Sequence, residues 1–284
     1  MTIGMLNQQV VTFAGDDLGF VVNDHGVIDA TAYFNTGEFM AGGPERWALA
    51  APPEVHAVLL HHWGGWYGPR LDAKATPSEE FAQIVGCARD HRERFGIGPG
   101  YSLNVFPSGR VWAVGKHGTH RAHTAGREPQ TRERWNVVGR AVAVAGDYET
   151  EDVTVTLARG IRDAIAEVTR WPGAGRNLPV FEHGLTPTVD SAGVMFAQAT
   201  PCPGRNLAAW RAAGGLTLNG AESHQPDRFG EGYVQGYRVG FGRGVKDVLA
   251  AFDDAMDAGA ALISAPPDPP VVPAAPPVLT AVSR

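Results

Sequence analysis

The chain has 284 residues, enough for one full hydrophobic core with extensions, and its formal net charge of -6 argues against a nucleic-acid partner. Two cysteines exclude a disulfide-stapled scaffold, and no apolar run approaches the roughly 18 residues of a membrane span. The start, MTIGMLNQQVV, lacks basic residues and a long apolar core, so we expect no signal peptide.

Residues 1–50 are interpreted as an N-terminal extension built from short strands. Apolar clusters at 10–13 and 20–22 are broken by Gly and Asp. The many turn residues around these clusters argue against a helical domain.

Residues 51–213 alternate predicted strands with predicted helices. The apolar run 58–60 ends in His61 and His62, and a second apolar run at 179–181 precedes His183, so both runs are typical of short buried strands. The segment 76–79 combines an N-cap Thr, a first-turn Pro and a capping-box Glu, which predicts a helix from 77 to about 94. Its predicted inner face consists of Phe81, Ile84, Val85 and Ala88.

A turn and a second helix complete this middle part. Pro107, Ser108 and Gly109 separate two apolar runs and predict a hairpin. Residues 153–170 place Leu157, Ile161, Ile165 and Val168 at helical spacing, with one buried stripe. These elements predict an α/β fold, a mixed central β-sheet flanked by helices.

The C-terminal part divides into a Gly-rich segment, 214–264, and a Pro-rich tail, 265–284. Glycines recur every fourth residue from 232 to 244, which on a helix places them on nearly one face. We expect a helix over 228–262 that docks on a second copy of the chain or on a virion or wall partner. The alternative is a flexible linker, because each Gly costs about 1 kcal/mol of helix propensity relative to Ala.

Cys202 stands between two prolines in TPCPG, which offers a soft thiolate at a fixed backbone position. Two histidines and one cysteine with an open position form an established catalytic zinc set. The alternatives stay open on spacing alone. A lone Cys is usually a small buried hydrophobe, a His at a strand end is usually hydrogen-bonded structure, and no CxxC or HExxH pattern supports a metal.

Several segments follow one another in order: LLHHW at 59–63, His91, GPGYSLNVFPSGRVW at 98–112, RAHTAG at 121–126, Asn136, VAVAGDYE at 142–149, FEH at 181–183 and TPCPG at 200–204. From about 55 to 207 the chain thereby resembles the zinc-dependent N-acetylmuramoyl-L-alanine amidases of the peptidoglycan-recognition and phage-lysozyme type. The resemblance implies their fold, and hydrolysis of the amide between N-acetylmuramic acid and L-alanine in peptidoglycan. The alternative is a wall-binding module or virion structural protein without activity. Non-catalytic relatives typically lose the cysteine, so its presence favours an enzyme.

The resemblance also implies a role for each matching residue. Zn²⁺ is expected on His61, His183 and Cys202, because strand alternation turns His62 to the opposite face. Tyr101 and Thr200 are expected to be catalytic. Substrate contacts are expected from His123, Asn136 and His62, with turn capping as the alternative for Asn136. His91 is expected to be structural, and Cys87 a packed thiol.

One departure from the family lies near the predicted metal ligands. Eighteen residues separate His183 from Cys202, and an inserted loop, TPTVDSAGVMFAQA, explains the excess. The absence of a signal peptide and the wall substrate together suggest a phage endolysin-like enzyme. Such an enzyme is made in the host cytoplasm and reaches the wall through a separate pore or on a virion.

Overall fold

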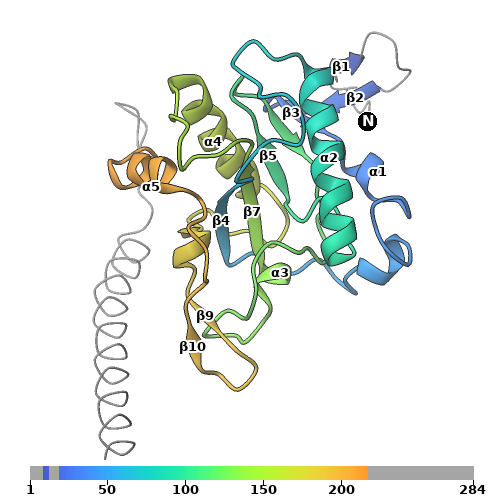
Figure 1. Ribbon diagram of the computed structural model, residues 1–284. Helices are drawn as coiled ribbons and strands as arrows, with labels where there is room; N and C mark the ends of the chain where they lie inside the picture. The colour runs from blue at the N-terminus through green and yellow to red at the C-terminus, as the bar shows by residue number, and fades with distance from the viewer. Residues whose placement is uncertain (1–8, 13–18, 217–284) are drawn as a thin grey trace, which may run out of the picture. The chain divides into compact units, whose positions relative to one another are not determined.

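The computed structural model describes residues 9–12 and 19–216 (Figure 1). Within them one sheet of eight strands has the order β1-β2-β3-β6-β5-β7-β4-β8. Its strands are β1 (Gln9–Thr12), β2 (Gly19–Val22), β3 (Val27–Asp29), β6 (Val111–Ala113), β5 (Leu103–Val105), β7 (Gly139–Val144), β4 (Ala57–His62) and β8 (Val180–Glu182). The pairs β3–β6, β5–β7, β7–β4 and β4–β8 are parallel and the others antiparallel. The predicted mixed sheet is confirmed.

Helices flank this sheet, as predicted. They are α1 (Thr31–Phe34), α2 (Pro77–Phe95), α3 (Trp135–Val138), α4 (Val155–Val168) and α5 (Arg205–Ala212), with short 3-10 turns η1 (Pro44–Trp47) and η2 (His183–Leu185). The predicted capping box begins α2: Thr76 Oγ1 accepts from the Glu79 amide, and the Glu79 carboxylate accepts from the Thr76 amide at 2.7 Å. A cap of this kind stabilises a helix by about 1 kcal/mol.

The two faces of the sheet bury different helices because side chains alternate along each strand. Val58 and Leu60 of β4 pack with Leu157 and Ile161 of α4. On the opposite face, Ala141 and Ala143 of β7 pack with Cys87 of α2 and with Tyr101. His61 contacts this same Tyr101, so the alternation places His61 and His62 on different faces. On the predicted inner face of α2, Ile84 and Ala88 are fully buried, whereas Phe81 and Val85 are partly buried.

The N-terminal segment joins the same sheet. β3 pairs in parallel with β6, and Ile28 lies opposite Trp112. Phe20 and Phe34 pack against Phe81 of α2, with ring centroids 4.9 and 5.9 Å apart. Residues 19–34 therefore share a hydrophobic cluster with α2 and extend the sheet of the middle part.

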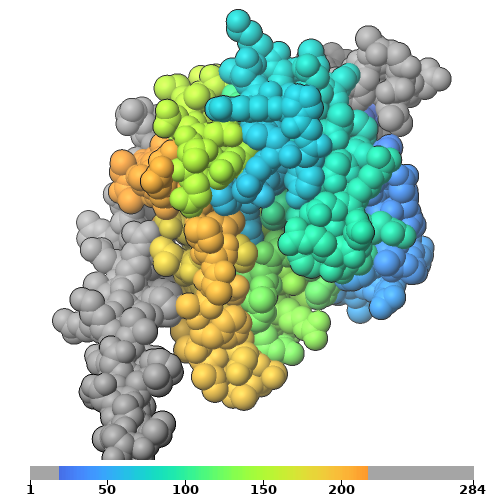
Figure 2. Space-filling model, viewed as in Figure 1, coloured from blue at the N-terminus to red at the C-terminus, as the bar shows by residue number. Residues whose placement is uncertain are grey.

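The excess chain between His183 and Cys202 forms an antiparallel hairpin of β9 (Thr188–Val189) and β10 (Met195–Phe196). Figure 2 shows it, in gold, as a projection at the lower edge of the coloured residues. Its base is fixed, because the Val189 and Arg127 main chains exchange hydrogen bonds of 3.0 Å and Gln198 donates to the Ala125 carbonyl at 2.9 Å. The hairpin is thus attached to the loop that follows His123.

The helix predicted over 228–262 and the tail 265–284 lie outside the described residues and stay predictions. Among the helices within 19–216, none has the length and apolar character that a membrane span requires.

Candidate metal centre

Three side chains from distant parts of the chain meet at one end of the sheet. They are His61, the second-to-last residue of strand β4, His183 directly after β8, and Cys202 in the loop before α5. One ligand atom of each lies within 4.8 Å of the other two. His61 and Cys202 are 2% and 8% exposed, whereas His183 is only half-buried. His183 is therefore the most exposed of the three.

The two nitrogens of the His61 ring face the Cys202 sulfur and the Thr124 hydroxyl. His61 Nδ1 lies 3.7 Å from Cys202 Sγ, and Nε2 lies 3.5 Å from Thr124 Oγ1. The same hydroxyl is 3.0 Å from His123 Nδ1. If Nε2 carries the proton and donates to Thr124, the Nδ1 lone pair faces the sulfur. A hydrogen bond on the remote nitrogen is how proteins hold metal-binding histidines.

Cys202 is held from two sides. The His62 main-chain N–H donates to Cys202 Sγ at 3.4 Å. The Gly184 N–H, next to His183, donates to the Cys202 carbonyl at 2.7 Å. A side chain at Gly184 would place its Cβ 2.5 Å from the Thr200 carbonyl oxygen, so only glycine permits this approach. The main chain at Cys202 is thereby joined to η2, the turn that begins with His183.

Protonation states favour cation binding through the histidines. Burial, with the neighbouring His183, holds the pKa of His61 well below its ordinary value. Burial lowers the pKa of His183 to about 4. Both imidazoles are therefore neutral at pH 7 and offer lone pairs. Burial raises the pKa of the Cys202 thiol to about 12, so the metal-free chain keeps a proton there that a bound cation must displace.

The donor set fits zinc. Two imidazoles and one thiolate are ligands that Zn²⁺ prefers, at about 2.0–2.1 Å for nitrogen and 2.3 Å for sulfur. Tetrahedral angles then separate a nitrogen and a sulfur ligand by about 3.5 Å, close to the 3.7 Å between His61 Nδ1 and Cys202 Sγ. The absence of a fourth side chain from this cluster of described residues is typical of catalytic rather than structural zinc sites.

Tyr101 lies beside the cluster and is 9% exposed. Its ring centroid is 5.4 Å from that of His61 and 5.0 Å from that of His91. Burial raises the pKa of the Tyr101 hydroxyl well above its ordinary value. The hydroxyl is consequently protonated at neutral pH and is a hydrogen-bond donor.

The His91 ring packs against the Tyr101 ring. It is 5% exposed, and its Nδ1 accepts from the Gly100 N–H at 2.9 Å. Its other nitrogen lies 4.0 Å from Cys87 Sγ, and Cys87 is fully buried. His91 and Cys87 therefore pack against Gly100 and Tyr101, which precede β5.

We expect His91 to make the zinc-free fold sensitive to acid. Burial lowers its pKa from 6.5 to about 4, so between these values the unfolded chain binds more protons, and stability falls as the pH falls. His91 alone should remove about 3 kcal/mol of unfolding free energy between pH 7 and pH 4. Urea unfolding of His91→Gln, which keeps an acceptor for Gly100, should show a shallower pH dependence. An unchanged dependence contradicts this assignment.

Thr200, His123 and Asn136, the other predicted site residues, lie near the cluster. Thr200 Oγ1 accepts from the Cys202 N–H at 3.2 Å. The His123 ring is 7% exposed, with its centroid 5.6 Å from that of His61. Asn136 Oδ1 accepts from the His123 and Thr124 amides at 2.8 and 2.9 Å, which fixes their loop.

His62 points away from the three donors. Its Nδ1 accepts from the Tyr148 N–H at 3.1 Å and lies 3.9 Å from the Asp147 carboxylate. The His62 ring and the Asn136 side-chain amide thus have protein partners of their own, and direct substrate contact by either stays a prediction. Thr124 and the turn that begins at Asp147 were not predicted to be site residues. Thr124 falls within RAHTAG, but no spacing singles out its hydroxyl.

No protein-family model matches the chain, and no curated protein matches its sequence. Among solved structures, bumblebee PGRP-SA is 17% identical with a TM-score of 0.46, covering 63% of this chain and 89% of its own. The endolysin LysCS of Clostridium intestinale, an N-acetylmuramoyl-L-alanine amidase, is 17% identical with a TM-score of 0.39, covering 60% and 91%. Drosophila PGRP-LB in complex with tracheal cytotoxin is 17% identical with a TM-score of 0.44, covering 65% and 99%. The structural neighbours of this chain are thus peptidoglycan-recognition proteins and N-acetylmuramoyl-L-alanine amidases.

Proposed function

We propose that the chain is a zinc-dependent N-acetylmuramoyl-L-alanine amidase that cleaves the amide between N-acetylmuramic acid and L-alanine in bacterial peptidoglycan. The observation that carries this proposal is the convergence of His61, His183 and Cys202 within 4.8 Å. The choice of substrate rests on the order of sequence segments that resembles this amidase family. A lytic, phage endolysin-like role on the cell wall is part of the same proposal.

Zinc bound at this centre would act as a Lewis acid on the scissile carbonyl and would lower the pKa of a water molecule. His61 and His183 would hold the cation as neutral ligands and Cys202 as a thiolate, with the Thr124 hydroxyl 3.5 Å from His61 Nε2. Tyr101 donates its hydroxyl proton in a hydrogen bond to the attacking water or to the developing oxyanion. Thr200, whose oxygen accepts from the Cys202 amide, still has a hydroxyl proton to donate to that oxyanion. We assign substrate contacts to His123, whose ring centroid lies 5.6 Å from that of His61, to Asn136 and to His62.

Digestion of purified peptidoglycan tests this function. The zinc-loaded chain should release glycan strands free of peptide and create new N-terminal L-alanine, detected by amine labelling and mass spectrometry. Chelation should stop the release, and added zinc should restore it. New reducing sugar ends in place of new amino termini contradict the proposal. Co-sedimentation with the wall but no cleavage indicates a binding module or a virion structural protein instead.

A further inference from the structure

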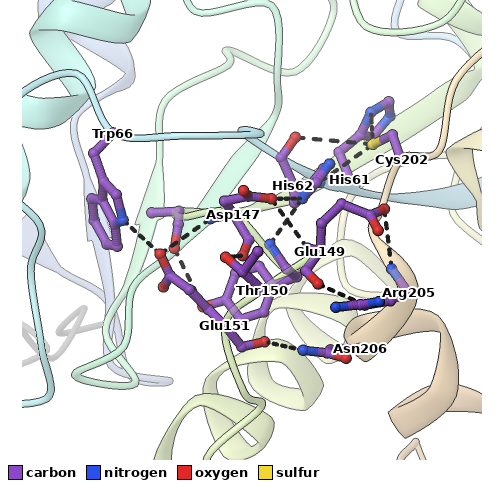
Figure 3. A network of polar contacts seen from close by, with 12 residues as sticks. His61, His62, Trp66, Asp147, Glu149, Thr150, Glu151, Cys202, Arg205 and Asn206 are labelled. Carbon is purple, nitrogen blue, oxygen red and sulfur yellow. Dashed lines mark hydrogen bonds and ion pairs between the residues drawn. The ribbon is translucent and has the colours of Figure 1, made fainter.

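The turn Asp147–Glu151 follows β7 in the chain. In space it lies between the end of β4 and the start of α5 (Figure 3). Its shape is fixed internally, because the Asp147 carbonyl accepts from the Thr150 and Glu151 amides at 3.1 and 2.9 Å. The Trp66 indole N–H donates to the Glu151 carboxylate at 2.8 Å and attaches the turn to the loop after β4. The turn is therefore a rigid support rather than a loose connection.

On one side the turn contacts the strand that carries His61. The Tyr148 N–H donates to His62 Nδ1 at 3.1 Å. The main-chain N–H of His62 in turn donates to Cys202 Sγ at 3.4 Å. The turn thus holds His62, the β4 residue whose main chain contacts the Cys202 sulfur.

On the other side the turn caps α5. Gly204, the N-cap residue, has no side chain to accept from the first amides of the helix. The Arg205 N–H donates instead to the Glu149 carboxylate at 3.2 Å, and the Asn206 N–H donates to the Tyr148 carbonyl at 3.0 Å. Acidic groups at a helix N-terminus are stabilising, because the exposed N–H groups carry partial positive charge.

Two side chains of α5 complete the attachment. Arg205 Nε donates to the Glu149 carbonyl at 2.8 Å, and Asn206 Nδ2 donates to the Glu151 carbonyl at 2.9 Å. Gly204 has a φ of 88°, and a Cβ there would lie 2.6 Å from the Tyr148 carbonyl carbon. The main chain just after Cys202 therefore lies against the turn without space for a side chain.

We infer that Glu149 and Asn206 are positioning residues that hold the Cys202 sulfur at the distance from His61 that zinc requires, an inference that rests on the metal centre of the proposed function. Cys202 precedes α5 by three residues, so movement of the helix start moves the sulfur. The hydrogen bond from the Gly184 N–H holds the Cys202 carbonyl, and the turn holds the main chain that follows Cys202. Residues that orient metal ligands typically contribute 10–100-fold to metal affinity.

Zinc competition against a chelator tests the inference on the full chain. Asn206→Ala and Glu149→Ala should each weaken zinc binding about 10–100-fold, and with cobalt in place of zinc both should weaken the thiolate-to-cobalt charge-transfer band. Glu149→Gln should keep most of the affinity that Glu149→Ala loses, because its amide oxygen still accepts from the Arg205 N–H although it carries no charge. Asn23→Ala is the matched control, because it removes a 3.1 Å hydrogen bond to Glu167 outside this network. It should keep full affinity.

Equal affinities in Asn206→Ala, Glu149→Ala and Asn23→Ala overturn the inference while leaving the metal centre intact. A loss in Glu149→Gln as large as that in Glu149→Ala also overturns it, because the hydrogen bond is then not the cause. If Asn206→Ala does not fold, the two Glu149 variants decide the question, since that side chain is only partly buried. A wild-type chain that binds neither metal overturns the metal centre and this inference together.

Discussion

Replacement of Cys202 by serine should remove zinc from the protein and abolish cell-wall hydrolysis. A serine hydroxyl stays protonated at neutral pH and is a poor ligand for zinc, whereas the thiolate is among its preferred ligands. We expect zinc affinity to fall by more than about 100-fold, beyond the loss that removal of a supporting hydrogen bond causes. Elemental analysis after dialysis measures the effect, and circular dichroism of the zinc-free proteins checks that both fold. Full zinc retention in Cys202→Ser would show that the sulfur is not a ligand.

The two adjacent histidines provide an internal control for this result. His61→Ala should lose zinc, because Nδ1 of His61 lies 3.7 Å from Cys202 Sγ. His62→Ala should retain much more zinc, because its ring contacts Tyr148 on the other face of the sheet. The reverse outcome, with zinc kept by His61→Ala and lost by His62→Ala, would mean that the wrong histidine is assigned.

Tyr101→Phe should leave zinc bound and slow hydrolysis by about 10- to 1,000-fold, the range for losing one transition-state hydrogen bond. The ring packs between His61 and His91, and phenylalanine preserves that packing, so the fold should survive. Burial keeps the hydroxyl protonated by raising its pKa, so the variant loses a donor and no charge. Turnover on soluble muropeptide measures the effect.

The zinc content and thermal stability of Tyr101→Phe serve as its controls, and both should match the wild type. Unchanged turnover would assign Tyr101 a packing role alone. A loss of turnover together with a loss of zinc would indicate that the phenylalanine disturbs His61 instead.

Local patterns predicted those parts of the fold that depend on near neighbours in the chain. The capping box at Thr76 and Glu79 is observed, and α2 begins at Pro77 as predicted. The Pro107–Gly109 turn joins the antiparallel strands β5 and β6. The second predicted helix is present but shorter, Val155–Val168, because Thr154 caps its start. Each of these features is determined by side chains within a few residues, which is why the sequence alone reveals them.

Features that depend on distant contacts could not be predicted in the same way. Thr124 approaches His61 across 63 residues of sequence, and Asn206 reaches Glu151 across 55. No local spacing marks such pairs, since the chain brings them together only through the order of strands in the sheet. The segment before Cys202 was predicted as an inserted loop and contains a hairpin of two-residue strands, too short for an alternating pattern to be visible.

The separation of the proposed zinc ligands along the chain has a consequence for the stability of the protein. His61 and Cys202 are 141 positions apart, so a cation bound by both acts as a removable cross-link that closes most of the domain into one loop. Closing a long loop reduces the conformational freedom of the unfolded chain, and any ligand that binds only the folded chain adds to its stability. Without zinc at the proposed centre, we therefore expect the protein to unfold more readily and to be cut faster by proteases.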